Sequence, residues 1–231
     1  MSQENSEDPF ANEKLESALR WALPLVQKTT GSPRTAPQVR QATPEEMIPR
    51  LANELRLQYR VQNPSAKESE VQEMAKNYAY NLRGKYSASD HIIYIVSENL
   101  IRRSEELTNP DYLSESYLRG ILIHELVHAA DEETFHALSR LATGKKEHEL
   151  QIHNALLEGH AQYVTKKILQ KEGQGDLFDF IERDILYVPA ELSEGTKYRL
   201  LQQNNMNYFQ YVAGRRFFET EGGRKNQFHQ C

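Results

Sequence analysis

The chain contains 231 residues and carries a formal net charge of −5, with acidic and basic residues interspersed. This length predicts one domain, or one domain with an arm, and is ample for a hydrophobic core. The charge pattern excludes a basic surface for nucleic acid or for an anionic membrane. No apolar run approaches the roughly 18 residues that a membrane span needs, and the single cysteine, Cys231, excludes an intrachain disulfide.

Residues 1–10 are polar and acidic, and we expect them to be disordered. They lack the basic and then apolar layout of a signal peptide, so a cytoplasmic location is the default expectation, which the absence of disulfides also favours. Residues 11–231 are predicted to form a single domain, in which residues 11–42 are a candidate N-terminal helical arm. Nothing in the sequence indicates an oligomeric state.

The first predicted helix covers residues 11–23 and ends near Pro24. Residues 29–37, rich in Thr, Pro, Gly and Ser, then form a linker. Later stretches with helical spacing of apolar residues predict further helices. These helices are expected over residues 65–84, 97–107, 113–131, 147–172, 176–186 and 193–220.

A capping box predicts where the second helix begins. Thr43 is the N-cap residue, Pro44 occupies the first helical position, and Glu46 can bond back to the backbone of Thr43. We expect this helix to run toward Val61.

Residues 91–96 form the clearest strand, because they combine β-branched and aromatic side chains. Residues 39–41 are a candidate second strand. The predicted fold class is therefore α+β, mostly helical, with a small sheet.

The motif H-E-x-x-H occurs once, as His124, Glu125 and His128. Only about 0.03 matches to this pattern are expected from the composition. On a helix, positions i and i+4 share one face, so both imidazoles can bind one zinc ion while the glutamate accepts a proton from a water molecule.

The helix that carries the motif is apolar on nearly every side, which indicates that it is buried. Burial of two histidines and a carboxylate costs several kcal/mol unless they find partners, and a metal ion supplies one. The alternative is a core helix whose histidines are merely hydrogen-bonded.

A catalytic zinc site needs a third protein ligand, and Glu158 is the leading candidate because it lies in a second apolar helix. The adjacent Gly159 is unfavourable inside a helix by roughly 1 kcal/mol relative to Ala, which close approach of two helices or ordinary tight packing would explain. Alternative third ligands remain open. They are Asp131, His136, His153 and His160.

An H-E-x-x-H helix followed by a metal-binding Glu on a later helix resembles the gluzincin group of zinc metallopeptidases. The E-G-x-A pattern that begins at Glu158 is similar to a signature of several gluzincin-like families. The run Tyr211–Phe217 and the Gly-Gly at 222–223 are similar to features that follow it in such families. The chain departs from the pattern in having 29 residues between His128 and Glu158, and in having Gln162 where an Asp is frequent.

The resemblance implies a zincin-like fold, a Zn²⁺ cofactor and a peptide or protein substrate bound along a strand beside the metal, for which residues 91–96 are the expected strand. It also implies a downstream Tyr or His that donates to the tetrahedral oxyanion. Tyr211 is preferred for this role, with Tyr208 and His229 as alternatives.

The sequence thus predicts a zinc metallopeptidase in which His124, His128 and Glu158 bind the metal and Glu125 is the general base. A metal-binding or regulatory protein with little turnover, on the same fold, is the alternative.

Overall fold

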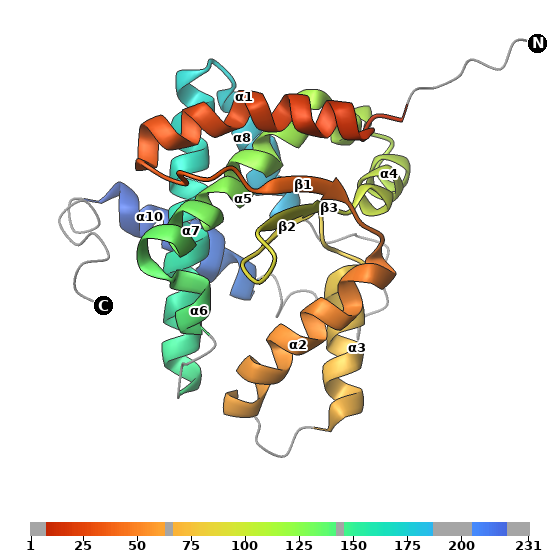
Figure 1. Cartoon of the computed structure of the whole chain (residues 1–231), viewed down its shortest axis with the longest axis vertical. Coiled ribbons are helices and arrows are strands. Elements are labelled where there is room, and N and C mark those ends of the chain that lie inside the picture. Colours follow the sequence, from red (N-terminus) through yellow and green to blue (C-terminus); the bar gives the residue numbers. More distant parts are fainter. Residues whose placement is uncertain (1–7, 63–66, 142–145, 187–204, 221–231) are drawn as a thin grey trace, which may run out of the picture.

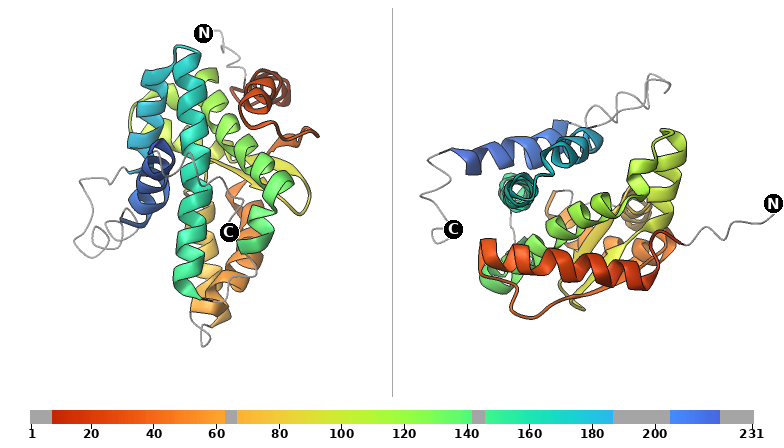
Figure 2. Two further views of the ribbon diagram at one scale, coloured as in Figure 1. Left: turned by 90° about the vertical axis from the view of Figure 1, so that its left-hand side faces the viewer. Right: turned by 90° about the horizontal axis from the view of Figure 1, so that it is seen from above.

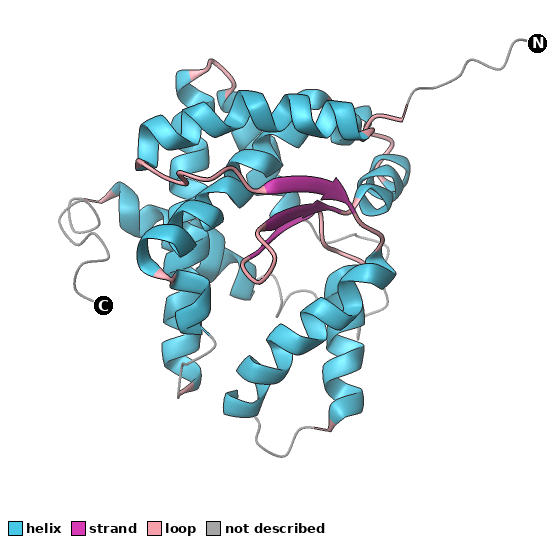
Figure 3. Cartoon of the chain, viewed as in Figure 1, coloured by secondary structure: helices cyan, strands magenta, loops and turns pink. Residues whose placement is uncertain are grey.

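A computed structural model describes residues 8–62, 67–141, 146–186 and 205–220 (Figure 1). Helices dominate and surround a small sheet (Figure 3), which confirms the predicted α+β, mostly helical class. The helices are α1 (Asn12–Thr30), α2 (Pro44–Gln62), α3 (Glu68–Ala79), α4 (Ser97–Glu106), the 3-10 helix η1 (Pro110–Leu113), α5 (Glu115–Phe135), α6 (Ala137–Leu141), α7 (Glu147–Lys171), α8 (Gly175–Ile185), the π-helix η2 (Tyr208–Ala213) and α10 (Gly214–Glu219).

The sheet has the order β1-β3-β2, with strands β1 (Gln38–Gln41), β2 (Gly84–Ser87) and β3 (Ile92–Ile95). β3 pairs in parallel with β1 and antiparallel with β2. The strand predicted at 91–96 is therefore the central strand, and the candidate strand at 39–41 lies at one edge. β2 forms the opposite edge, next to α5.

Each face of the sheet covers a separate hydrophobic cluster. Ile93 and Ile95 belong to the main cluster, which also contains buried residues of α1, α5, α7 and α8. Tyr94 and Val96 point to the other face, where they pack with residues of α2 and α3. The two-residue period of a strand thus places the helix with the H-E-x-x-H motif on one face and the α2–α3 pair on the other.

Helix α1 continues past Pro24 to Thr30 and stops at Gly31, whose backbone is left-handed (φ 80°). The predicted end near Pro24 was wrong because tertiary packing outweighs the hydrogen bond that proline removes. Val26, beyond the proline, is fully buried with Leu15 of the same helix in the main cluster. Phe10 is also buried there, and residues 1–7 lie outside the described part of the chain.

The capping box of α2 forms as predicted. The backbone N–H of Glu46 donates to Thr43 Oγ1 at 3.2 Å, and the N–H of Thr43 donates to Glu46 Oε2 at 2.9 Å. Two amide groups that lack helical partners are thereby satisfied by local sequence alone.

The helix predicted over residues 65–84 is shorter in the structure: α3 ends at Ala79, and β2 begins at Gly84. The turn between them is held from α4. Asn99 Nδ2 donates to the carbonyl oxygens of Ala79 and Leu82, and Arg102 donates to that of Tyr80. These contacts span about twenty residues, so local propensity gives no sign of them.

The C-terminal half packs as a group of helices on α5. Helix α7 contacts α5 on one side and the η2–α10 segment on another (Figure 2). Of the predicted helix at 193–220, residues 205–220 are described, and residues 205–219 are helical. No described helix is long and apolar enough to cross a bilayer.

Candidate metal centre

Helix α5 carries the H-E-x-x-H motif in the middle of the molecule. Ser114 caps its first turn, accepting from the N–H of Tyr117 at 3.1 Å, and His136 ends it in a left-handed conformation. Contacts on all sides bury the helix, as predicted. Because its backbone is fixed by that packing, the motif side chains have little freedom to change their relative positions.

His124, His128 and Glu158 converge at one point. The two Nε2 atoms are 3.1 Å apart, and Glu158 Oε2 lies 3.2 Å from Nε2 of His124 and 3.4 Å from that of His128. Three ligand atoms bound to a tetrahedral zinc ion at about 2.0–2.1 Å would be separated by about 3.3 Å. The donor atoms therefore fit one face of such a coordination sphere.

The electrostatics of these groups also favour a cation. Burial opposes ionisation of Glu158, but His128 and His124 hold the pKa of its carboxyl well below the usual range. Burial lowers the pKa of His128, but the Glu158 carboxylate raises it to about 8. A buried carboxylate facing two imidazole nitrogens stabilises positive charge between them.

The alternative third ligands lie elsewhere. Among the described residues, His124, His128 and Glu158 form the one cluster of three potential metal ligands. His160 Nδ1 is 2.9 Å from Asp131 Oδ2, so these two alternative ligands are hydrogen-bonded to each other. His136, at the end of α5, and His153 are not part of the cluster.

Glu125 is buried beside the cluster, with 8% of its surface exposed. Its Oε2 accepts a 2.7 Å hydrogen bond from the backbone N–H of Tyr86 in β2. Gly84 permits this contact, since a Cβ at that position would lie 2.5 Å from Cγ2 of Ile121 and 3.4 Å from Cγ of Glu125. The position of Glu125 is thus set jointly by α5 and the edge strand.

The strand that contacts Glu125 is β2, and not the expected strand at 91–96. Arg83 O accepts from the N–H of Val96, so Arg83, directly before β2, is hydrogen-bonded to the residue directly after β3. In an antiparallel pair, every second residue is bonded to the partner strand. The N–H and C=O groups of Gly84 and Tyr86 consequently point away from β3. No strand is predicted at these residues, because Gly84 is the expected end of the helix over residues 65–84.

Tyr211 joins the site from the π-helix η2. Its ring stacks on that of His124 with a centroid distance of 6.1 Å and an interplanar angle of 28°. Burial and then the nearby carboxylates of Glu158 and Glu125 raise the pKa of Tyr211 well above its usual value. Tyr208, in contrast, is 43% exposed and accepts from Arg216, and His229 lies outside the described residues.

A glycine contact brings the Tyr211 helix against α7. A Cβ on Gly159 would lie 2.5 Å from Cα of Gly214 and 2.7 Å from the backbone N of Arg215. Close approach of two helices is one of the two explanations predicted for the glycine at position 159. The helix that approaches α7 there is the C-terminal one, which contains Gly214. Since Gly159 follows Glu158 and Gly214 is three residues after Tyr211, this contact determines how the tyrosine meets the glutamate.

Comparison with known proteins adds a fold likeness. No family model and no curated protein matches the sequence. One solved structure, described as "a putative hydrolase with a novel fold" from Chloroflexus aurantiacus, is similar with a TM-score of 0.56. The identity is 15%, and the match covers 91% of this chain and 79% of that chain. The two proteins therefore share a fold over most of their lengths.

Proposed function

We propose that this protein is a zinc-dependent peptidase of the gluzincin type. The observation that carries the proposal is the triangle of His124, His128 and Glu158 donor atoms, with the buried carboxylate of Glu125 next to it on α5. The name of the structurally similar protein supports the broader class, a hydrolase.

Zinc is the cation that we assign to His124, His128 and Glu158. Two imidazole nitrogens and one carboxylate oxygen are a ligand set typical of catalytic zinc, whereas magnesium and calcium prefer oxygen ligands. When bound there, zinc supplies Lewis acidity and lowers the pKa of a water molecule toward neutrality. Three protein ligands would leave the fourth position of a tetrahedral zinc for that water and the substrate.

Glu125 is the general base in this proposal. It neighbours His124 in sequence, so its carboxylate lies close to the ligands without being one of them. The bond from Tyr86 N–H to Oε2 holds the carboxylate in a fixed orientation. Glu125 accepts the proton of the attacking water and passes it to the amine that leaves.

Tyr211 is the proposed oxyanion donor. Its phenol is protonated at neutral pH and can donate, and the stacking on His124 places the ring beside the metal ligands. A hydroxyl that donates to the substrate carbonyl oxygen would act where negative charge develops.

The edge of β2 is the proposed docking site for the peptide backbone. The outward N–H of Gly84 and the outward C=O groups of Gly84 and Tyr86 can pair with an extended chain. Such pairing would place the scissile bond near Glu125, because Gly84 packs directly on that side chain.

Zinc analysis combined with peptide hydrolysis tests the proposal. We expect about one zinc per chain, cleavage of a diverse peptide library, and loss of at least about a hundredfold in turnover for Glu125→Gln with zinc retained. Glu115→Gln is the matched control, because Glu115 lies exposed at the start of the same helix. His124→Ala is expected to lose the metal.

Two results would redirect the proposal. Equal turnover in Glu125→Gln would eliminate the general-base role. Stoichiometric zinc without hydrolysis of any peptide would favour the alternative, a metal-binding or regulatory protein with little turnover.

A further inference from the structure

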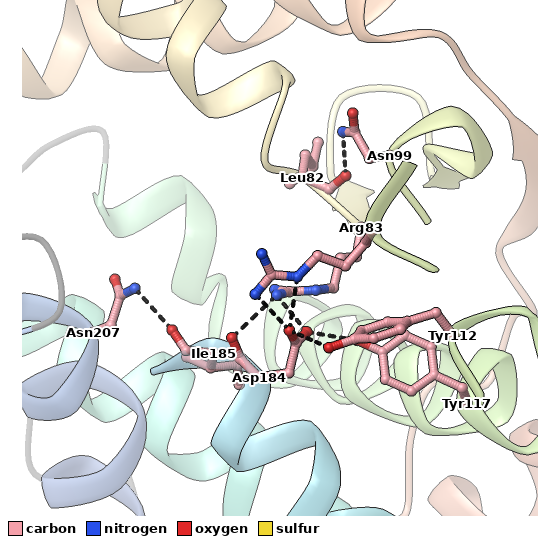
Figure 4. Close-up of polar contacts among 9 residues, drawn as sticks. Leu82, Arg83, Asn99, Tyr112, Tyr117, Asp184, Ile185 and Asn207 are labelled. Carbon is pink, nitrogen blue, oxygen red and sulfur yellow. Dashed lines mark hydrogen bonds and ion pairs between the residues drawn. The ribbon is translucent and has the colours of Figure 1, made fainter. Parts of the chain in front are cut away.

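Arg83 stands at the start of the strand edge that faces Glu125. Its carbonyl oxygen accepts from Val96 N–H at 2.9 Å, so sheet pairing extends to this residue. The preceding turn is fixed by Asn99, whose Nδ2 lies 2.6 Å from Leu82 O (Figure 4). The main chain at Arg83 is therefore firmly placed, one residue before the glycine that packs on Glu125.

The guanidinium of Arg83 closes a buried network around Asp184, the last residue but one of α8. The Asp184 side chain is 1% exposed. Its Oδ1 accepts from Arg103 Nη2 at 2.9 Å and from Tyr112 at 2.7 Å, and its Oδ2 accepts from Tyr117 at 2.9 Å (Figure 4). Both carboxylate oxygens thus have donors without Arg83.

Arg83 adds a second cation to the same carboxylate. Both of its bonds to Asp184, to Oδ2 and to the main-chain oxygen, use Nη2. Its side chain is 28% exposed, unlike the carboxylate below it. One carboxylate shared by two guanidinium groups leaves Arg83 with less than a full counter-charge, and leaves Nε and Nη1 outside the bonds to Asp184.

The end of α8, to which Arg83 is bonded, is tied to the segment that carries Tyr211. Asn207 Nδ2 donates to Ile185 O at 3.3 Å, which ties the end of α8 to the helix of Tyr211 (Figure 4). Arg83 and Tyr211 interact electrostatically across this junction. Arg83 thus directly precedes Gly84 of the substrate edge, and the end of α8 that it bonds adjoins the segment of the proposed oxyanion donor.

We propose that Arg83 binds a carboxylate of the substrate beside the scissile bond, an inference that rests on the proposed peptidase function. A guanidinium presents a planar fork that matches a carboxylate with two parallel hydrogen bonds. Lys85, the next cation along β2, does not compete for this role, because its Nζ is paired with Glu54 of α2 at 2.9 Å.

The carboxylate can come from the C-terminus of a peptide or from an Asp or Glu side chain. Three pools of N-acetylated pentapeptides separate these sources: neutral peptides with a free C-terminus, the same peptides amidated, and amidated peptides with one Glu. Binding is measured on zinc-loaded Glu125→Gln protein by mass spectrometry of the retained peptides, so hydrolysis does not interfere.

We expect at least one carboxylate pool to be retained about tenfold or more above the neutral amidated pool. Arg83→Met in the same background should abolish that preference, and so should Arg83→Gln, which keeps an amide donor for Asp184 and protects the fold. Arg103→Met is the matched control, since it removes the other arginine from Asp184, and it should keep the preference.

Equal retention of the three pools, or a preference that survives in both Arg83 variants, would overturn the inference. Cleavage of all pools at equal rates by the wild-type protein would overturn it while leaving the peptidase proposal intact. Arg83-dependent retention without any cleavage would support the carboxylate site and count against the peptidase proposal.

Discussion

Replacing Gly214 by alanine tests whether the glycine contact between α7 and the C-terminal helix positions Tyr211. A Cβ at Gly214 would lie 3.0 Å from Cα of Gly159 and closer still to the carbonyl oxygen of Ala155. Both obstacles are backbone atoms, so no rotamer change relieves the overlap. Overpacking of this kind costs about 1–3 kcal/mol, and we place Gly214→Ala at the upper end.

Alanine also gains roughly 1 kcal/mol in helix propensity over glycine, so the expected net loss in the free energy of unfolding is about 2 kcal/mol. Because the helix must move away from α7, Tyr211 shifts relative to Glu158. Peptide turnover should therefore fall while the zinc content stays unchanged.

Urea denaturation measures the stability loss, and zinc analysis with a peptidase assay measures the rest. Gly175→Ala is the control, since a Cβ there would have its nearest neighbour at 3.9 Å and should change stability by less than about 0.5 kcal/mol. A Gly214→Ala protein as stable and as active as wild type would refute the positional role of this contact.

Asp184→Asn should lower the free energy of unfolding by about 3–5 kcal/mol in urea, because it leaves Arg83 and Arg103 without their buried carboxylate; a loss below about 1 kcal/mol would contradict that view. Burial raises the pKa of Asp184, but Arg83 and its other donors hold it below the usual value. Its contribution is thus present above about pH 4 and is lost as the pH falls further. Acid unfolding followed by circular dichroism should accordingly be less steep in Asp184→Asn than in wild type. Thr43→Ala should cost about 1 kcal/mol through loss of the cap of α2, and Thr43→Ser, which keeps the hydroxyl, should not.

Local signals predicted those elements whose stabilising contacts are local. The capping box of Thr43 and Glu46 forms within four residues, and its geometry follows from the sequence. The apolar composition of α5 and the helical spacing of apolar residues in α7 likewise identified both helices that carry potential ligands. Pro24 misled the prediction of α1, because the packing of that helix on α5 comes from residues about a hundred positions away.

The edge strand β2 shows why part of the site was not predictable. Its four residues are too few for a clear alternation, and the turn before it depends on Asn99 of α4. The group that orients Glu125 is a main-chain N–H, which any residue other than proline at position 86 would supply. A pattern of side chains in the sequence therefore cannot predict this contact. Arg83 and Asp184 escaped notice for a related reason, since they are 101 residues apart and neither lies in a motif.

The two halves of the candidate site are held by different kinds of contact. On α5 and β2, the helix backbone and the Tyr86 bond fix His124, His128 and Glu125. Glu158 and Tyr211 come from α7 and η2, whose relative position depends on a contact between Gly159 and Gly214 that tolerates no side chain. The halves meet where Glu158 faces both imidazoles and where Tyr211 stacks on His124. A cation held by His124, His128 and Glu158 would therefore join two helices of one core, and the position of Tyr211 beside it would depend on small residues that bind nothing themselves.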